Sequence, residues 1–233
     1  MESKESGSIA SDLLTAHLND YLGSWSTDRD LLQVIGSERR LLPDWDGEVR
    51  DFVGVVDAAG HGVISVPPNL VEPVTELVAE VDGSDRSPLR RLPALLDLKN
   101  STYFEGVFRF TASPEPFASD GVWTPCSSEE VPGWLKPFGG DVLLAFDDSG
   151  RYIAGVGIKR LSRFGRELAV VTEERGRGAG LAKALISQAS VRILEEGAVP
   201  IYLHSQQNFA SARVADAVGF YDKGWRILGI HRQ

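Results

Sequence analysis

The chain has 233 residues, of which 42% are hydrophobic and 24% charged, and this composition is typical of a folded globular protein. The formal charge of −9 is unevenly distributed. Residues 151–233 carry 13 Lys and Arg against 7 Asp and Glu, a net +6, whereas residues 1–150 carry a net −15. The basic last third indicates an anionic partner for that part of the chain.

Several kinds of protein are excluded at this point. The single cysteine, Cys126, allows no internal disulfide and no cysteine-built metal site. The four histidines are scattered without metal-ligand spacing, so no metal is expected. The first ten residues lack the apolar core of a signal peptide, and no stretch approaches the ~18 apolar residues of a membrane span. We therefore expect a cytoplasmic protein with no membrane partner.

The first half of the chain predicts short helices and strands. Residues 1–8 are polar and indicate a loose tail. Asn69 follows two prolines and is a suitable helix cap. In chain order, hydrophobic spacing predicts two helices, a strand pair, two more helices and a β-rich run: Ile9–Leu22, Arg29–Arg40, Phe52–Asp57 with Gly62–Val66, Asn69–Val81, Leu89–Leu98 and Tyr103–Thr111.

Residues 112–140 are irregular and contain five prolines. Such a segment is either a linker between domains or a long structured loop that lines a site. We place a domain boundary near residue 115, which gives an N-terminal domain over residues 1–115, of no assigned type, and a C-terminal domain over residues 116–233.

The last third has clearer signals. A turn at Asp147–Gly150 predicts a hairpin, and Gly197 ends a helix. The predicted order is β-β-β-α-β-α-β, with these bounds: Val142–Phe146, Tyr152–Lys159, Glu167–Thr172, Gly180–Glu196, Ile201–His204, Asn208–Gly219 and Phe220–Ile230.

A glycine-rich turn lies between the third of these strands and its helix. Gly176, Gly178 and Gly180 allow a ligand to approach the backbone, and the first N–H groups of a helix attract phosphate. Arg175 and Arg177 add cationic groups suited to phosphate oxygens. The turn therefore predicts a pyrophosphate site. It lacks the Walker A string, and Leu181 stands where a dinucleotide-binding fingerprint needs glycine. An ordinary strand-to-helix turn is the alternative.

Arg175, Gly178 and Gly180 also match the pattern [QR]-x-x-G-x-[GA], by which this region resembles the GNAT superfamily of N-acyltransferases. Asn208 opens the next helix eleven residues before Gly219, which Phe220 follows, and this spacing recurs in the same family. The string from Asn208 to Phe220 is similar to the branch of zwittermicin-resistance-type acetyltransferases. The resemblance covers about residues 140–230.

The resemblance implies an α/β (α+β) fold with a mixed, mainly antiparallel sheet flanked by helices. The N-terminal half would complete the sheet or form a degenerate companion domain. It also implies binding of acetyl-CoA (coenzyme A) as co-substrate. The cofactor-binding residues would be the backbone of the third strand, the amides of the turn and the start of the next helix: Ala169, Val170, Val171, Arg175, Gly176, Arg177, Gly178, Ala179, Gly180, Leu181, Asn208 and Ser211.

The catalytic residues are less clear. Many family members have a Tyr acid seven residues after the helix-opening Asn, where this chain has Ala215. Glu167 is a candidate base, and its alternative is a strand-end Glu paired with Arg166 or Arg163. His204 is a second candidate because an imidazole suits proton transfer near neutral pH. Ser211 and Tyr202 are weighed against plain solvent contact and packing.

The expected function is direct transfer of an acetyl group from acetyl-CoA to an amine of a small molecule. An N-terminal or peptide amine is the alternative acceptor, and a non-catalytic CoA-binding module is the alternative from another class. Nucleic acid is not an expected partner, because the total charge is acidic and the basic residues gather at one turn. The oligomeric state is left open, a homodimer among the options.

Overall fold

The chain passes between two structural units five times. In the computed structural model, which describes residues 2–26 and 32–232, unit 1 extends to His17 and continues with Arg109–Tyr202 and Asn208–Tyr221. Unit 2 consists of Leu18–Phe108, Leu203–Gln207 and the residues from Asp222 onward. Since neither unit is one continuous segment, the domain boundary near residue 115 stays a prediction.

Unit 1 is built on a mainly antiparallel sheet whose strands run in the order β9-β8-β7-β6-β5. Only the β8–β9 pair is parallel. The predicted hairpin is confirmed, because the turn at Asp147–Gly150 joins β6 to β7. The strand bounds are Val122–Pro125 for β5, Asp141–Phe146 for β6, Tyr152–Arg160 for β7, Gly165–Thr172 for β8 and Val199–Ser205 for β9.

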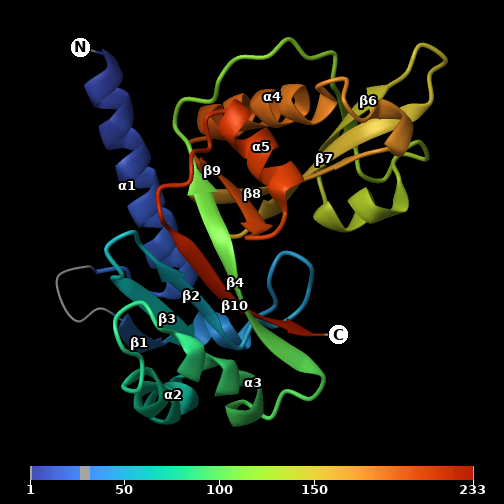
Figure 1. Cartoon of the computed structure of the whole chain (residues 1–233). Coiled ribbons are helices and arrows are strands. Elements are labelled where there is room, and N and C mark those ends of the chain that lie inside the picture. Colours follow the sequence, from blue (N-terminus) through green and yellow to red (C-terminus); the bar gives the residue numbers. More distant parts are fainter. Residues whose placement is uncertain (1, 27–31, 233) are drawn as a thin grey trace. The chain divides into compact units, whose positions relative to one another are not determined.

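One face of this sheet is covered by α4 (Leu181–Glu195), and α5 (Phe209–Ala217) lies against α4, as Figure 1 shows. Both helices lie where the sequence predicts them. Side chains of alternate strand residues pack against the apolar stripe of α4, and Leu168, Ile186 and Phe220 are almost fully buried there. Burial of this apolar surface holds the strand that precedes the glycine turn and the helix that follows it in one rigid layer.

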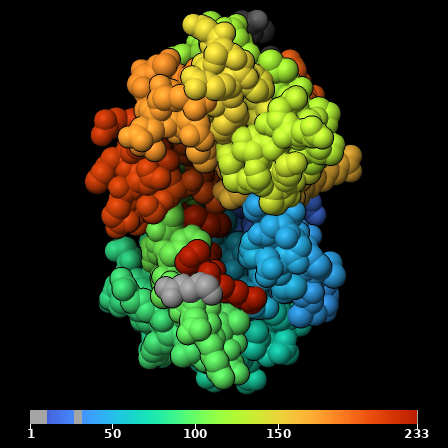
Figure 2. Space-filling view, turned by 90° about the vertical axis from the view of Figure 1, so that its right-hand side faces the viewer, coloured from blue at the N-terminus to red at the C-terminus, as the bar shows by residue number. Residues whose placement is uncertain are grey.

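The irregular segment packs on the opposite face of the unit 1 sheet. Its 3-10 helix η4 (Gly133–Phe138) lies over β7, where a Cβ atom on Gly157 would be 2.5 Å from the Phe138 ring. Leu135 is fully buried in the same apolar cluster, which Trp134 joins at its edge. Figure 2 shows the segment in yellow-green beside the yellow β6–β7 hairpin. Residues 131–138 are therefore part of the packing of unit 1.

The strands of unit 2 are mainly antiparallel and run in the order β1-β3-β2-β10-β4, with one parallel pair between β1 and β3. The short helices α2 (Val71–Val78) and α3 (Leu92–Leu95), with η2 (Pro68–Leu70) and η3 (Ser87–Arg91) before them, supply its apolar cluster. The strands are Leu32–Gly36, Gly62–Val66, Val53–Val56, Arg226–Arg232 and Ser101–Phe110. Sheets flanked by helices in both units confirm the predicted α/β (α+β) class.

Three predictions for the first half are wrong. Helix α1 (Glu2–Leu22) begins at Glu2, within the expected tail. Leu32–Gly36 is a strand and not part of a helix, because it pairs with β3 and contains the β-branched Val34 and Ile35. Residues 29–31 of that prediction lie outside the described residues. Asn69 does not cap a helix, since Pro68 already starts η2. Within the described residues, no helix is long and apolar enough to cross a membrane.

Candidate functional site

Strand β8 loses its partner halfway along its length. Gly165, Arg166 and Glu167 pair with Val199, Pro200 and Ile201 of β9, and the pairing ends there although β8 continues to Thr172. The other edge of β8 stays paired with β7 as far as Thr172. The stretch from Leu168 to Thr172 therefore has one open edge about 16 Å long, at ~3.3 Å per residue. Its N–H and C=O groups on that side need partners from water or a ligand.

The open edge leads directly into the glycine-rich turn. Gly178 and Gly180 have φ values of +83° and +81°, in the left-handed region that favours glycine. A Cβ atom on either residue would meet nothing within 4 Å, so the backbone is accessible there. Gly176 differs, because it is buried and an added Cβ would lie 3.1 Å from Leu181. The backbone of the turn is therefore accessible at Gly178 and Gly180 and packed at Gly176.

Helix α4 begins at this turn without a side-chain cap. The N–H groups of Gly176 and Arg177 are already used, because they donate to the carbonyls of Glu173 and Glu174 at 2.9 and 3.2 Å. Within the described part of the chain, no hydrogen bond is recorded for the amides of Gly178, Ala179 and Gly180. These amides, with the positive end of the helix dipole, can bind an anion.

The side chains of the two arginines in the turn, Arg175 and Arg177, differ in the contacts that they make. Arg175 donates to the carbonyl of Tyr152, and its Nε lies 3.5 Å from Asp147 Oδ2. The Asp147 carboxylate accepts from Ser149 and from Arg151, which lowers its pKa well below the ordinary 3.8. The Arg175 side chain therefore anchors the turn to the hairpin, whereas Arg177 has no ion pair among the described residues.

Asn208 and Ser211 form the start of α5. Asn208 is its N-cap, and the Asn208 Oδ1 atom accepts from the Ser211 N–H at 3.0 Å. The Ser211 side chain is half-buried and shares a hydrogen bond with the phenol of Tyr202, which is 3% exposed. Burial raises the pKa of Tyr202, and the bond to Ser211 partly offsets this. Ala215, one turn after Ser211, is fully buried in the apolar cluster under the sheet.

Glu167 stands at the last residue pair between β8 and β9. It is 8% exposed, and its Oε1 atom lies 2.5 Å from the Nζ atom of Lys159 on β7. Neither Arg163 nor Arg166 is its ion-pair partner, and the strand starts at Gly165, two residues before Glu167. Lys159 is the residue that sequence reasoning missed. The hairpin register would have found it, since Lys159 and Glu167 are directly opposite.

His204 belongs to unit 2. Its imidazole is 8% exposed, and Nδ1 lies 2.8 Å from the carbonyl oxygen of Ser205. Since a carbonyl accepts only, this contact requires the proton on Nδ1. The remaining predicted residues, Ala169 to Val171 and the turn from Arg175 to Leu181, belong to unit 1, as do Asn208 and Ser211.

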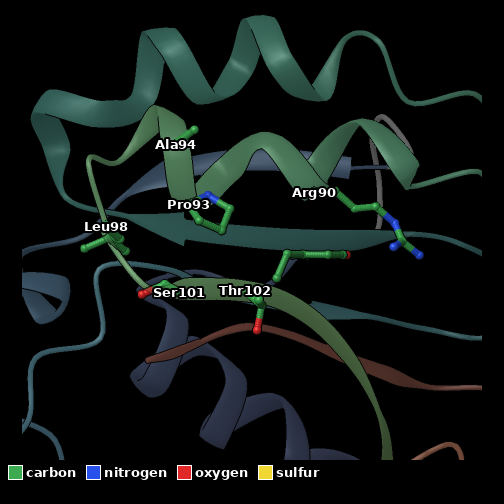
Figure 3. Close-up of a pocket in the computed structure, with 7 residues that line it drawn as sticks. Arg90, Pro93, Ala94, Leu98, Ser101 and Thr102 are labelled. Atoms are coloured by element: carbon green, nitrogen blue, oxygen red, sulfur yellow. The ribbon is translucent and has the colours of Figure 1, made fainter. Parts of the chain in front are cut away.

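Unit 2 has a pocket with a volume of about 440 Å³ between η3, α3 and the start of β4, shown in Figure 3. No predicted site residue lines it. Tyr103 contributes to it, but its phenol donates to Glu105, and burial holds the pKa of Tyr103 far above its usual value. The other lining residues are Arg90, Pro93, Ala94, Leu98, Ser101 and Thr102. Among the described residues there is also no cluster of three metal-ligating side chains.

The model of the acetyltransferase (GNAT) family matches residues 95–220. The match covers more than half of the chain, and the protein belongs to this family. Within unit 1 it takes in β5 to β8, the glycine turn, α4 and α5. No curated protein sequence matches the chain at a significant level.

The chain also matches solved structures, at low identity and with TM-scores below 0.5. A GNAT acetyltransferase from Colwellia psychrerythraea is 14% identical over 73% of this chain and 76% of its own, with a TM-score of 0.47. A GNAT-family protein from Novosphingobium aromaticivorans is 20% identical over 57% and 67%, also at 0.47. The protein yncA from Salmonella typhimurium, solved with its cofactor acetyl-CoA, is 18% identical over 40% and 64%, at 0.32.

Proposed function

We propose that the protein transfers an acetyl group from acetyl-CoA to an amine of a small molecule. The observation that carries the proposal is the open edge of β8, which runs into an uncapped helix start with accessible amides. An extended ligand arm ending in a pyrophosphate fits both features at once. Family membership supports acetyl-CoA as this ligand, because acetyl-CoA has such an arm and such a group.

The residues of the site fit the co-substrate as follows. The amides of Gly178, Ala179 and Gly180 and the first turn of α4 hold the pyrophosphate, with Arg177 as the nearby cation. The backbone of Ala169 to Val171 pairs with the amide groups of the arm along the open edge of β8. Asn208 and Ser211 border the arm from α5. When bound, acetyl-CoA supplies the activated acyl group.

Glu167 is the residue we propose to accept the proton of the amine. It lies at the end of the open edge that is farther from the glycine turn, where the reactive end of an extended arm would be. Lys159 fixes its carboxylate at 2.5 Å. We keep His204 as a second candidate, with its Nδ1 proton directed at Ser205. The acidic N-terminal half suits a cationic acceptor, although it serves solubility equally well.

A CoA-binding module without catalysis is the second candidate function. It is favoured by Ala215, whose burial leaves no proton donor at that position, and by the ion pair that already engages Glu167. An N-terminal or peptide amine is the alternative acceptor within the enzyme class.

Two measurements test the proposal. Acetyl-CoA at a hundred times its dissociation constant should stabilise the protein by ~2.7 kcal/mol in thermal unfolding. Release of free thiol from acetyl-CoA should then increase with one member of an amine panel and fall in Glu167→Gln. Lys136→Gln, an exposed change in η4, is the matched control. No stabilisation by acetyl-CoA would refute the binding claim, and binding without turnover on small amines or peptides would favour the module.

A further inference from the structure

Two arginines lie directly opposite each other on the β7–β8 hairpin of unit 1. Arg160, the last residue of β7, pairs with Arg166, the second residue of β8. Directly opposite residues share one face of a sheet, where like charges repel each other. Burial lowers the pKa of Arg166, and the positive charge of Arg160 lowers it further. The hairpin therefore has an electrostatic cost at this pair, and the proposed function does not explain it.

Hydrogen-bond donors of this pair lack acceptors in the described part of the chain. Arg166 donates through Nη1 to the carbonyls of Ser162 and Gly165, whereas its Nε is buried without a partner. The Arg160 guanidinium lies beside the backbone of Gly140, where an added Cβ atom would be 3.2 Å from Nη2. Among residues 2–26 and 32–232, no carboxylate forms an ion pair with either arginine. Unpaired donors of this kind cost free energy unless a ligand or water accepts from them.

The acidic side chains beside this pair are already bound to another arginine. Arg192 of α4 lies 3.1 Å from Asp141 and 3.1 Å from Glu196. Glu196 also attracts Arg166, although its ion pair is with Arg192. Three arginines thus share two carboxylates here. The surplus positive charge lies at Arg160 and Arg166, and it favours the binding of an anion.

The arginine pair is separate from the proposed coenzyme site. Ile158 and Leu168 form the next pair on the same face of the hairpin, and both are buried in the cluster that contains α4. The pair therefore faces α4, near Glu196 at the end of that helix. The glycine turn precedes the other end of α4, which has 15 residues and is ~22 Å long. Glu167 lies on the opposite face of the hairpin, paired with Lys159.

We propose that Arg160 and Arg166 form a second anion site, which binds a single phosphate group. Guanidinium groups bind phosphate oxygens through paired N–H donors, and a tetrahedral phosphate has enough oxygens for both arginines. Its negative charge replaces the repulsion between the two side chains by an attraction to each of them. Inorganic phosphate and the phosphate group of a small molecule share this chemistry. The site goes beyond the proposed function and does not depend on it.

The binding test measures thermal unfolding in inorganic phosphate, with chloride at the same ionic strength as reference, because salt alone screens the repulsion. Phosphate at ten times its dissociation constant should raise the folding equilibrium constant of wild type about elevenfold more than that of Arg160→Gln. Arg163→Gln removes the same charge from the turn of this hairpin, where the guanidinium lies over the Phe164 ring, and should behave as wild type. Phosphate bound at the glycine turn would stabilise all three proteins equally. Equal gains in wild type and Arg160→Gln would overturn the proposal.

A second measurement separates an anion site from a structural role of the arginine. In chloride, Arg160→Gln should raise Tm, because it removes the repulsion, and Arg160→Lys should not, because it keeps the charge. Arg160→Lys should bind phosphate more weakly than wild type, since it loses the guanidinium fork. A lower Tm of Arg160→Gln in chloride would show that the protein itself satisfies this guanidinium, and the proposal would fail.

The affinity for acetyl-CoA distinguishes this site from the proposed coenzyme site. Arg160→Gln should leave that affinity unchanged, because the arginine pair and the glycine turn are at opposite ends of α4. A loss of acetyl-CoA binding in Arg160→Gln would assign the pair to the coenzyme site and overturn the proposal. Failure of the wild-type protein to bind acetyl-CoA would refute the proposed function alone.

Discussion

Gly178 and Gly180 in unit 1 and Gly54 and Gly106 in unit 2 are glycines with opposite surroundings. The first two have positive φ values and open space where a side chain would be. An added Cβ on Gly54 would lie 3.1 Å from Leu228, and one on Gly106 would lie 2.9 Å from Ile227. Glycine in unit 2 lets strands and side chains pack closely, whereas in unit 1 it leaves the backbone accessible.

Strand pairing shows the same contrast. In unit 2, β10 and β4 pair over seven residues, from Arg226 with Val107 to Arg232 with Ser101. In unit 1, β8 and β9 pair over three. A glycine turn therefore indicates a ligand site only where the neighbouring strand also leaves backbone groups unpaired.

The largest expected effect tests whether the two units are energetically separate. Phe220→Ala empties a fully buried position in unit 1 and should cost about 3–5 kcal/mol. Because the chain passes between the units five times, we expect one cooperative denaturant transition, moved as a whole. Leu92→Ala, at a fully buried position in unit 2, should move the same transition. Two transitions, each sensitive to one variant, would contradict this.

The next effect concerns the ion pair at the separation point of β8 and β9. Lys159→Met leaves the Glu167 carboxylate buried without its ammonium partner, which should lower the free energy of unfolding by about 2 kcal/mol. Adding Glu167→Gln should recover part of the loss, because the uncompensated charge is gone. A double-mutant cycle by urea denaturation measures the coupling. Additive effects of the two changes would show that the pair contributes nothing.

The two kinds of glycine should respond differently to the same change. Gly178→Ala should weaken the binding of acetyl-CoA about tenfold, or ~1.4 kcal/mol. A side chain disfavours positive φ at this position and would crowd the proposed phosphate-binding site. Gly54→Ala should leave the affinity unchanged and lower stability by ~1 kcal/mol through overpacking against Leu228. Calorimetric titration and thermal unfolding give the two quantities. A loss of affinity in Gly54→Ala would remove the distinction.

The smallest effect is a pH dependence at the hairpin beside the glycine turn. The folded-state pKa of Asp147 is depressed, so its contribution to stability is present above the ordinary value of 3.8 and is lost as the pH falls below it. Asp147→Asn should therefore lower Tm slightly at pH 7, and the difference from wild type should shrink on acidification. Asp148→Asn, at the neighbouring exposed position, is the control. A Tm difference between wild type and Asp147→Asn that grows below pH 4 would contradict a depressed pKa of Asp147.

The last third of the chain was largely predictable because its signals are local. The turn at Asp147–Gly150, the glycines before α4 and the capping Asn208 each act within a few residues. The ion pair of Arg175 was not predictable, since its partner Asp147 is distant in sequence. The motif fixes the backbone of the turn, whereas the hairpin decides where that guanidinium points.

The first half was less predictable because its elements depend on distant partners. Leu32–Gly36 becomes a strand through parallel pairing with β3, thirty residues later in the sequence. In the last third of the chain, the ion pair of Glu167 likewise required the β7–β8 register, which hydrophobic spacing alone does not give. Predicted motifs therefore indicate where the candidate site lies, and the sheet register determines which of its side chains form ion pairs and hydrogen bonds.

Strand β10 lies between β2 and β4 and follows both of them in the described part of the chain. During synthesis on the ribosome, both neighbours emerge long before it and wait with exposed edges, which other strands can join. A chain cut after residue 225 would keep this gap permanently. A separate peptide with the sequence of residues 226–232 should then bind in the gap. The folding of unit 2 could then be completed at a chosen time by adding this peptide.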